Sequence, residues 1–105
     1  MSSLRRYEIL VPLLFNNGQP VPETLLTATF IELRDQFGAA SWETQALKGG
    51  WEHEGAVYLD NLTRFFVDVP DLPEHREFFV AFKARLKKRF DQLEIWITSH
   101  PVDVI

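Results

Sequence analysis

The sequence predicts an α+β protein in which four antiparallel strands form one sheet and two helices cover one of its faces. Segments with the apolar periodicity of strands and helices follow one another in the order β-α-β-β-α-β. Glycine and proline separate these segments, and right-handed crossovers place both helices on the same side. This is the ferredoxin-like arrangement. A length of 105 residues suits one domain, so we expect a single domain over residues 1–105.

The first half of the chain predicts a strand, a turn and a helix. A strand is expected over Tyr7–Leu14, because apolar residues occupy both of its faces as in a largely buried strand. Residues 16–20 favour a turn, and Pro22 suits the first turn of a helix that ends at Gly38. The apolar stripe of this helix repeats at four, three and four residues and consists of Leu26, Phe30, Leu33 and Phe37.

A hairpin is expected in the middle of the chain. A weaker strand over Ala40–Lys48 leads into a polar turn over Gly49–Gly55, and a long strand over Ala56–Val69 follows. Because fourteen residues are long for a strand, we expect a bulge or bend at Asp60-Asn61.

The last elements are a second helix and a fourth strand. Asp71 and Glu74 occupy the positions of a helix cap and a capping box. The helix that follows has a buried stripe made of Phe79, Phe82, Leu86 and either Phe90 or Leu93. A strand over Glu94–His100 is expected next, and Pro101 ends it or places it at a sheet edge.

The uncovered face of the sheet is expected to carry four large rings, from Trp42, Tyr58, Phe66 and Trp96. This assignment depends on strand register, because a slip of one residue moves a side chain to the other face. A monomer rarely leaves so large an aromatic patch in water. We therefore expect a homodimer that buries this ligand or dimer face, or a long loop folded over it.

Composition excludes several classes of site and partner. The chain has no cysteine, which rules out disulfides and thiolate sites and agrees with a cytoplasmic location. Its formal charge of −4 does not favour a nucleic-acid partner, and no apolar run approaches the length of a membrane span. No cofactor is expected. The three histidines, at 53, 75 and 100, match no metal motif, so no metal site is expected either.

Two groups of polar residues are candidates for chemistry. On the open face His100, Tyr58, Asp60 and Arg64 form a candidate catalytic set, because histidine titrates near neutrality and can transfer protons. In the middle turn the candidates are Trp51, His53 and Glu54, where carboxylates flank an imidazole. A solvated turn is the favoured explanation of that second group.

A cluster of cations lies in the C-terminal half of the second helix and consists of Lys83, Arg85, Lys87, Lys88 and Arg89. Cations at a helix C-terminus are stabilised by about 0.3–1 kcal/mol each, which explains their position without a ligand. A phosphate or nucleic-acid surface is the alternative.

The second half of the chain resembles small uncharacterised α+β protein families. The shared motifs are a Gly-x-Trp turn at Gly49 and Trp51 and an Arg-Phe-x-Gln helix exit at Arg89, Phe90 and Gln92. In topology the chain is also similar to dimeric α+β barrel proteins, which include heme-degrading and cofactor-free oxygenases. The resemblance implies a fold and no particular activity.

Three hypotheses about function follow from the sequence. The first is a homodimeric binding or accessory module that uses the aromatic face. The second is a small enzyme of the dimeric α+β barrel type, with a small-molecule ligand in an apolar pocket. The third is a binder of phosphate or nucleic acid through the basic end of the second helix.

Overall fold

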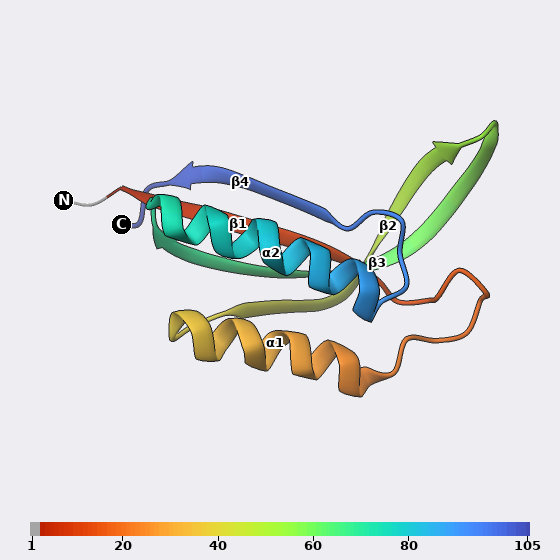
Figure 1. Ribbon diagram of the computed structural model, residues 1–105, viewed down its shortest axis with the longest axis horizontal. Coiled ribbons are helices and arrows are strands. Elements are labelled where there is room, and N and C mark those ends of the chain that lie inside the picture. The colour runs from red at the N-terminus through yellow and green to blue at the C-terminus, as the bar shows by residue number, and fades with distance from the viewer. Residues whose placement is uncertain (1–2) are drawn as a thin grey trace.

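The predicted order of elements is confirmed in the computed structural model, which describes residues 3–105. The elements are β1 (Leu4–Pro12), α1 (Glu23–Phe37), β2 (Ser41–His53), β3 (Ala56–Pro70), α2 (Pro73–Arg89) and β4 (Trp96–Val102). The strands form one antiparallel sheet in the order β2-β3-β1-β4, and both helices lie on the same face (Figure 1). The ferredoxin-like fold is therefore correct.

The core lies between the sheet and the helices. On β1 and β3, alternate residues point at the helices, including the fully buried Ile9, Val11 and Phe65. The predicted α2 stripe is confirmed, with Phe90 rather than Leu93 as its last member. In the α1 stripe Leu26 and Leu33 are buried, while Phe30 and Phe37 pack at the margin of the core. Each large buried side chain contributes about 1.5–3 kcal/mol to folding.

Trp42 belongs to this core, so its predicted place on the open face is wrong. It pairs in register with Phe65 and packs between that ring and Phe30 of α1, at centroid distances of 5.4 and 5.9 Å. Its indole Nε1 donates a hydrogen bond of 2.9 Å to Thr63 Oγ1, which in turn donates to the carbonyl oxygen of Glu43. Trp42 therefore anchors β2 beneath α1.

The helix ends agree with prediction at α1 and differ at α2. Gly38 follows α1 in the left-handed conformation, at φ 85°, and its N–H donates to the carbonyl oxygen of Arg34. The capping role predicted for Asp71 is wrong, because α2 begins at Pro73 without a side-chain cap. Asp71 forms an ion pair with Arg5 instead, at 3.2 Å.

The predicted turn over Gly49–Gly55 is also wrong in extent. Strand β2 continues to His53, and the turn consists of Glu54 and Gly55, both at positive φ as a tight hairpin turn requires. Gly49 is a strand residue paired with Asp60, and glycine suits this position because a Cβ there would lie 2.8 Å from Leu62 Cδ1. The strand irregularity lies on β2 between Glu43 and Leu47, and not at Asp60-Asn61.

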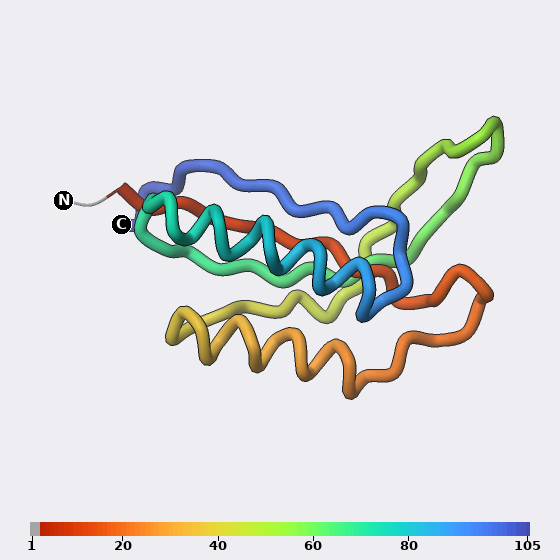
Figure 2. Tube along the Cα trace, viewed as in Figure 1, coloured from red at the N-terminus to blue at the C-terminus, as the bar shows by residue number. Residues whose placement is uncertain are grey.

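The tip of the β2–β3 hairpin projects from the body of the molecule (Figures 1 and 2). Strand β1 pairs with β3 only as far as Pro12 opposite Leu62, so the last part of the hairpin has no third strand. We call residues 49–60 the hairpin arm. The arm is where most of the exposed rings and aliphatic side chains of the sheet are found.

We predict that Thr63→Val lowers the free energy of unfolding by about 1–3 kcal/mol, because it leaves the Trp42 indole and a strand carbonyl without their partner. Urea unfolding measures this change. Thr98→Val, at an exposed position of β4, is the matched control and is expected to change stability by less than about 0.5 kcal/mol. Equal effects of the two substitutions would contradict the buried network.

Candidate functional site: the hairpin arm

One face of the hairpin arm brings together an indole, an imidazole, a phenol and a carboxylate. The rings of Trp51 and Tyr58 stack with centroids 4.7 Å apart, and the ring of His53 lies 5.9 Å from that of Trp51. Trp51 Nε1 donates a hydrogen bond of 2.7 Å to Asp60 Oδ2. We call these four residues the arm cluster.

Strand register explains why the arm cluster forms. Trp51 pairs with Tyr58 and Gly49 with Asp60, so the alternation of the two strands places all their side chains on one face. Because Gly49 carries no side chain, the indole of Trp51 reaches diagonally to the carboxylate of Asp60. The predicted turn candidates Trp51 and His53 therefore join the predicted catalytic candidates Tyr58 and Asp60.

The other face of the arm is aliphatic and exposed. Leu59 is 84% exposed and Val57 is 71% exposed, while Trp51 and Tyr58 on the first face are each less than half exposed. The arm thus offers an aromatic and acidic face on one side, and on the other a face where Val57 and Leu59 lie beside Glu52. Glu54 lies at the tip, 3.8 Å from His53 Nε2.

The rest of the predicted catalytic set is not assembled at this site. His100 lies on β4 opposite Arg6, which lies opposite Asp68 on β3. Asp68 and Tyr58 are ten residues apart on one strand, which corresponds to about 33 Å. Arg64 lies between these ends, with its Nε 3.9 Å from Glu43 Oε2. His100 therefore lies far from Tyr58 and Asp60 within one protomer, and Arg64 lies beside Glu43 rather than in the arm cluster.

The open face of the sheet is more charged than predicted. Arg6 donates two hydrogen bonds to Asp68, at 2.7 and 2.9 Å, and its guanidinium lies 4.5 Å above the ring of Phe66. Of the four predicted rings, Trp96 remains well exposed on this face, at 62%. The hydrogen bonds from Arg6 hold the pKa of Asp68 below its ordinary value, against the opposing effect of desolvation.

The basic end of α2 is used largely within the molecule. Arg85 and Arg89 both bind Glu32 of α1, at 3.1 and 2.8 Å, and Lys83 binds Glu94 at 2.8 Å. The Lys83 hydrogen bond lowers the pKa of Glu94. These contacts join the two helices and fix the exit from α2. Within residues 3–105 Lys87 and Lys88 form no ion pair, so two of the five predicted cations are left for a phosphate or a nucleic acid.

Two further properties bear on the kind of site. Within residues 3–105 no three acidic, histidine or cysteine side chains come together in a group that could hold a metal ion. No helix in the described part of the chain has the length and apolar character needed to span a membrane.

Several solved structures share the fold. The chain is similar to a phage SAM lyase in complex with S-methyl-5'-thioadenosine, with a TM-score of 0.72 at 13% identity, over 99% of this chain and 92% of that one. The apo state of a phage SAM lyase has a TM-score of 0.66 at 20% identity, over 94% of this chain and 81% of that one. CutA1 from Oryza sativa has a TM-score of 0.59 at 12% identity, over 98% of this chain and 83% of that one.

These likenesses establish the topology of a small α+β protein and no specific activity. No protein-family model and no curated protein matches the sequence. The resemblance to small α+β proteins is therefore supported at the level of topology, by neighbours of similar size and element order.

We predict that Asp68→Asn lowers the free energy of unfolding at pH 7 by about 0.2–1 kcal/mol, the range of a solvent-accessible ion pair. The folded pKa of Asp68 lies below its ordinary 3.8, so the stabilisation is complete above that value and is lost as pH falls through the folded pKa. Urea unfolding at pH 7 and in strong acid measures both differences.

The matched control is Glu77→Gln, an exposed carboxylate of α2. It is expected to leave the unfolding free energy nearly unchanged at pH 7. If Asp68→Asn lowers the free energy of unfolding as much in strong acid as at neutral pH, the ion pair is not the source of the loss.

Proposed function

We propose that this chain works as a homo-oligomeric binding module whose copies associate through the hairpin arm. The observation that carries the proposal is the exposed aliphatic face of the arm, formed by Val57 and Leu59. Soluble monomers seldom hold aliphatic side chains so far out on a projecting element without a partner.

The isolated ribbon gives an independent physical reason. Two strands without a third are marginally stable in water, and here β2 also presents a free edge of unpaired backbone groups. A second copy that packs its arm against the first covers the aliphatic face and the edge at once. A two-fold dimer is the simplest closed arrangement of this kind. The absence of cysteine suits assembly in a reducing compartment such as the cytoplasm.

We expect Leu59→Lys to weaken self-association at least about tenfold. Burying one leucine is worth about 1.5–3 kcal/mol, and 1.4 kcal/mol is a factor of ten in affinity. Size-exclusion chromatography with light scattering across a concentration series measures the mass. Leu93→Lys, at an exposed leucine outside the arm, should leave it unchanged. A wild-type protein that stays monomeric at high micromolar concentration would falsify the proposal.

A second candidate function is the binding, and in an enzyme the cleavage, of an adenosyl sulfonium compound such as S-adenosylmethionine. The specific observation in its favour is the arm cluster, in which aromatic faces lie next to the carboxylate of Asp60. A ring face attracts a cation and also stacks with a nucleobase, and a carboxylate balances a positive sulfur. The fold shared with a phage SAM lyase supports this candidate by analogy.

The charge of the sulfonium distinguishes two parts of this site. S-adenosylmethionine carries a positive sulfur, whereas S-methyl-5'-thioadenosine has a neutral thioether and keeps the adenine ring. The Trp51–Tyr58 pair would hold the adenosine of both compounds, and Asp60 would favour the sulfonium. Release of the thioether breaks the carbon–sulfur bond of the amino-acid chain, with the electron pair going to sulfur. The carbon left behind bonds to an oxygen of the compound's own carboxylate and closes a lactone, so no further reactant is needed.

We predict that S-adenosylmethionine at 100 times its Kd raises the free energy of unfolding by about 2.7 kcal/mol. Trp51→Ala should lower the affinity for both compounds. Asp60→Asn should lower only the affinity for the sulfonium compound, by about tenfold. Glu52→Gln, on the opposite face of the arm, is the matched control. Calorimetric titration measures affinity, and chromatography detects any S-methyl-5'-thioadenosine released.

The results separate the two candidates. If Asp60→Asn lowers the affinity for both compounds equally, the role proposed for the charge of Asp60 is contradicted. No binding of either compound by the wild-type protein would remove this candidate and leave the self-associating module standing.

A further inference from the structure

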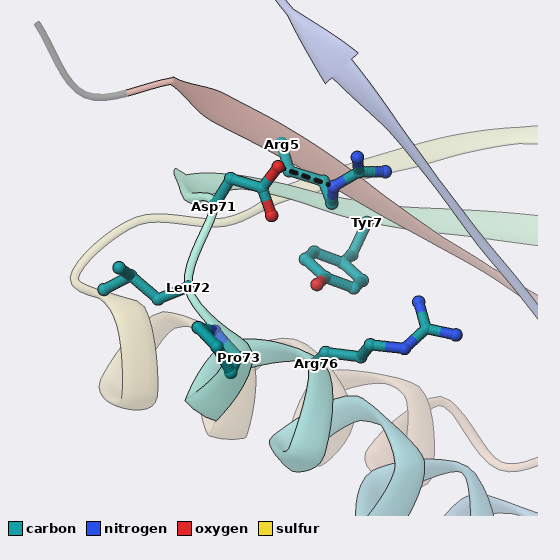
Figure 3. A pocket seen from close by; sticks show the side chains of 6 residues that line it. All are labelled: Arg5, Tyr7, Asp71, Leu72, Pro73 and Arg76. Carbon is teal, nitrogen blue, oxygen red and sulfur yellow. Dashed lines mark ion pairs between the residues drawn. The ribbon is translucent and has the colours of Figure 1, made fainter.

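A cavity of about 450 Å³ lies at the N-terminal end of α2, far from the hairpin arm (Figure 3). It is bounded by the start of β1, by the loop that leads into α2 and by the first turn of that helix. Its lining residues are Arg5, Tyr7, Asp71, Leu72, Pro73 and Arg76. A space of this size holds a small organic molecule.

Tyr7 places an unused hydrogen-bonding group in this cavity. The residue is only 3% exposed, and its ring stacks on that of Phe79 with centroids 4.2 Å apart. Among residues 3–105 no group forms a hydrogen bond with its hydroxyl, which faces the space between Asp71, Pro73 and Arg76 in Figure 3. The ring is buried, whereas the hydroxyl oxygen is accessible from the cavity, so it is free to form a hydrogen bond with a partner that enters.

The charges around the hydroxyl favour an anion as that partner. Asp71 is neutralised by Arg5, whose guanidinium also donates to Ser99 Oγ at 3.1 Å. Arg76 lines the same cavity and has no ion pair within the described residues. The N-terminus of the seventeen-residue helix α2 adds a partial positive charge.

An apolar groove continues from this cavity. A second cavity of about 210 Å³ shares Tyr7 and Arg76 with the first and runs along α2 beside β4. Phe79, Val80 and Ile97 form its apolar wall. The body of a ligand whose acidic group meets Arg76 would lie on this wall.

We propose that this groove binds an organic oxyanion, a carboxylate or phosphate monoester attached to an apolar or aromatic body. The guanidinium of Arg76 and the hydroxyl of Tyr7 donate hydrogen bonds to the oxyanion, and the body packs between α2 and β4. The site is separate from the arm cluster and does not depend on either function proposed above.

Calorimetric titration with phenyl phosphate, phenylacetate and inorganic phosphate tests the proposal. We expect saturable binding of at least one of the two aryl probes and weaker binding of inorganic phosphate, which has no body to fill the groove. The preferred aryl probe tells whether the site takes phosphate or carboxylate. Absence of saturable binding by both aryl probes, or equal affinity for inorganic phosphate, overturns the proposal.

Two substitutions localise the binding. Arg76→Gln should weaken it at least about tenfold, and Tyr7→Phe about threefold to tenfold, because each removes a donor to the anion. Arg34→Gln removes an exposed cation of α1 and should have no effect. Circular dichroism checks that all variants fold. Affinity that stays unchanged in both Arg76→Gln and Tyr7→Phe places the ligand elsewhere and contradicts the assignment.

Discussion

The unequal length of two paired strands determines where the exposed aromatic and aliphatic side chains of the sheet are found. Strand β3 has fifteen residues, whereas β1 has nine and stops pairing with β3 at Pro12 opposite Leu62. The hairpin beyond that point must leave the sheet and the cover of both helices. The arm therefore carries its apolar and aromatic side chains into solvent, and this exposure is the basis of the proposals that it binds a partner or a ligand.

The arm holds its shape through close packing across its two strands. Gly49 and Gly50 leave space for Leu62 and Leu59, whose side chains lie against them from opposite faces of the ribbon. The left-handed Glu54-Gly55 turn matches the natural twist of the strands. Trp51, stacked on Tyr58 and bonded to Asp60, adds cross-strand contacts that a bare ribbon lacks. The same side chains thus stabilise the arm and form its candidate binding face.

Apolar periodicity was sufficient to predict the elements, because the stripes of both helices and the alternation in β1 and β3 are strong. The register of the hairpin could not be obtained in the same way. A turn over residues 49–55 pairs Lys48 with Ala56, which puts Trp42 opposite Leu62 and on the open face. The real turn pairs His53 with Ala56, and with the irregularity in β2 it sets Trp42 opposite Phe65 in the core. The position of one turn thus decided the face of a tryptophan.

Long-range contacts explain the remaining differences between the expected and the observed sites. His100 and Tyr58 have strand positions that suit a shared face, yet the register places His100 level with Asp68, ten residues along β3 from Tyr58. Three of the five cations in the basic cluster of α2 are paired with Glu32 and Glu94, which lie on other segments and carry no local sign of this role. Tyr7 occupies an apolar position of the strand pattern, where a phenylalanine would fit equally well, so periodicity gives no sign of a role for its hydroxyl.

The ion pairs of α2 also determine which of its cations can bind a ligand. Lys83, Arg85 and Arg89 are held by carboxylates, whereas Arg76 lines a cavity together with the hydroxyl of Tyr7. The chain as a whole carries a formal charge of −4, so its long-range field does not attract anions. An oxyanion at this site must therefore be held by short-range hydrogen bonds and apolar contact. The face of the arm that carries Asp60 lies at the other end of the sheet. Its carboxylate suits a cationic ligand, which the negative net charge of the chain also attracts.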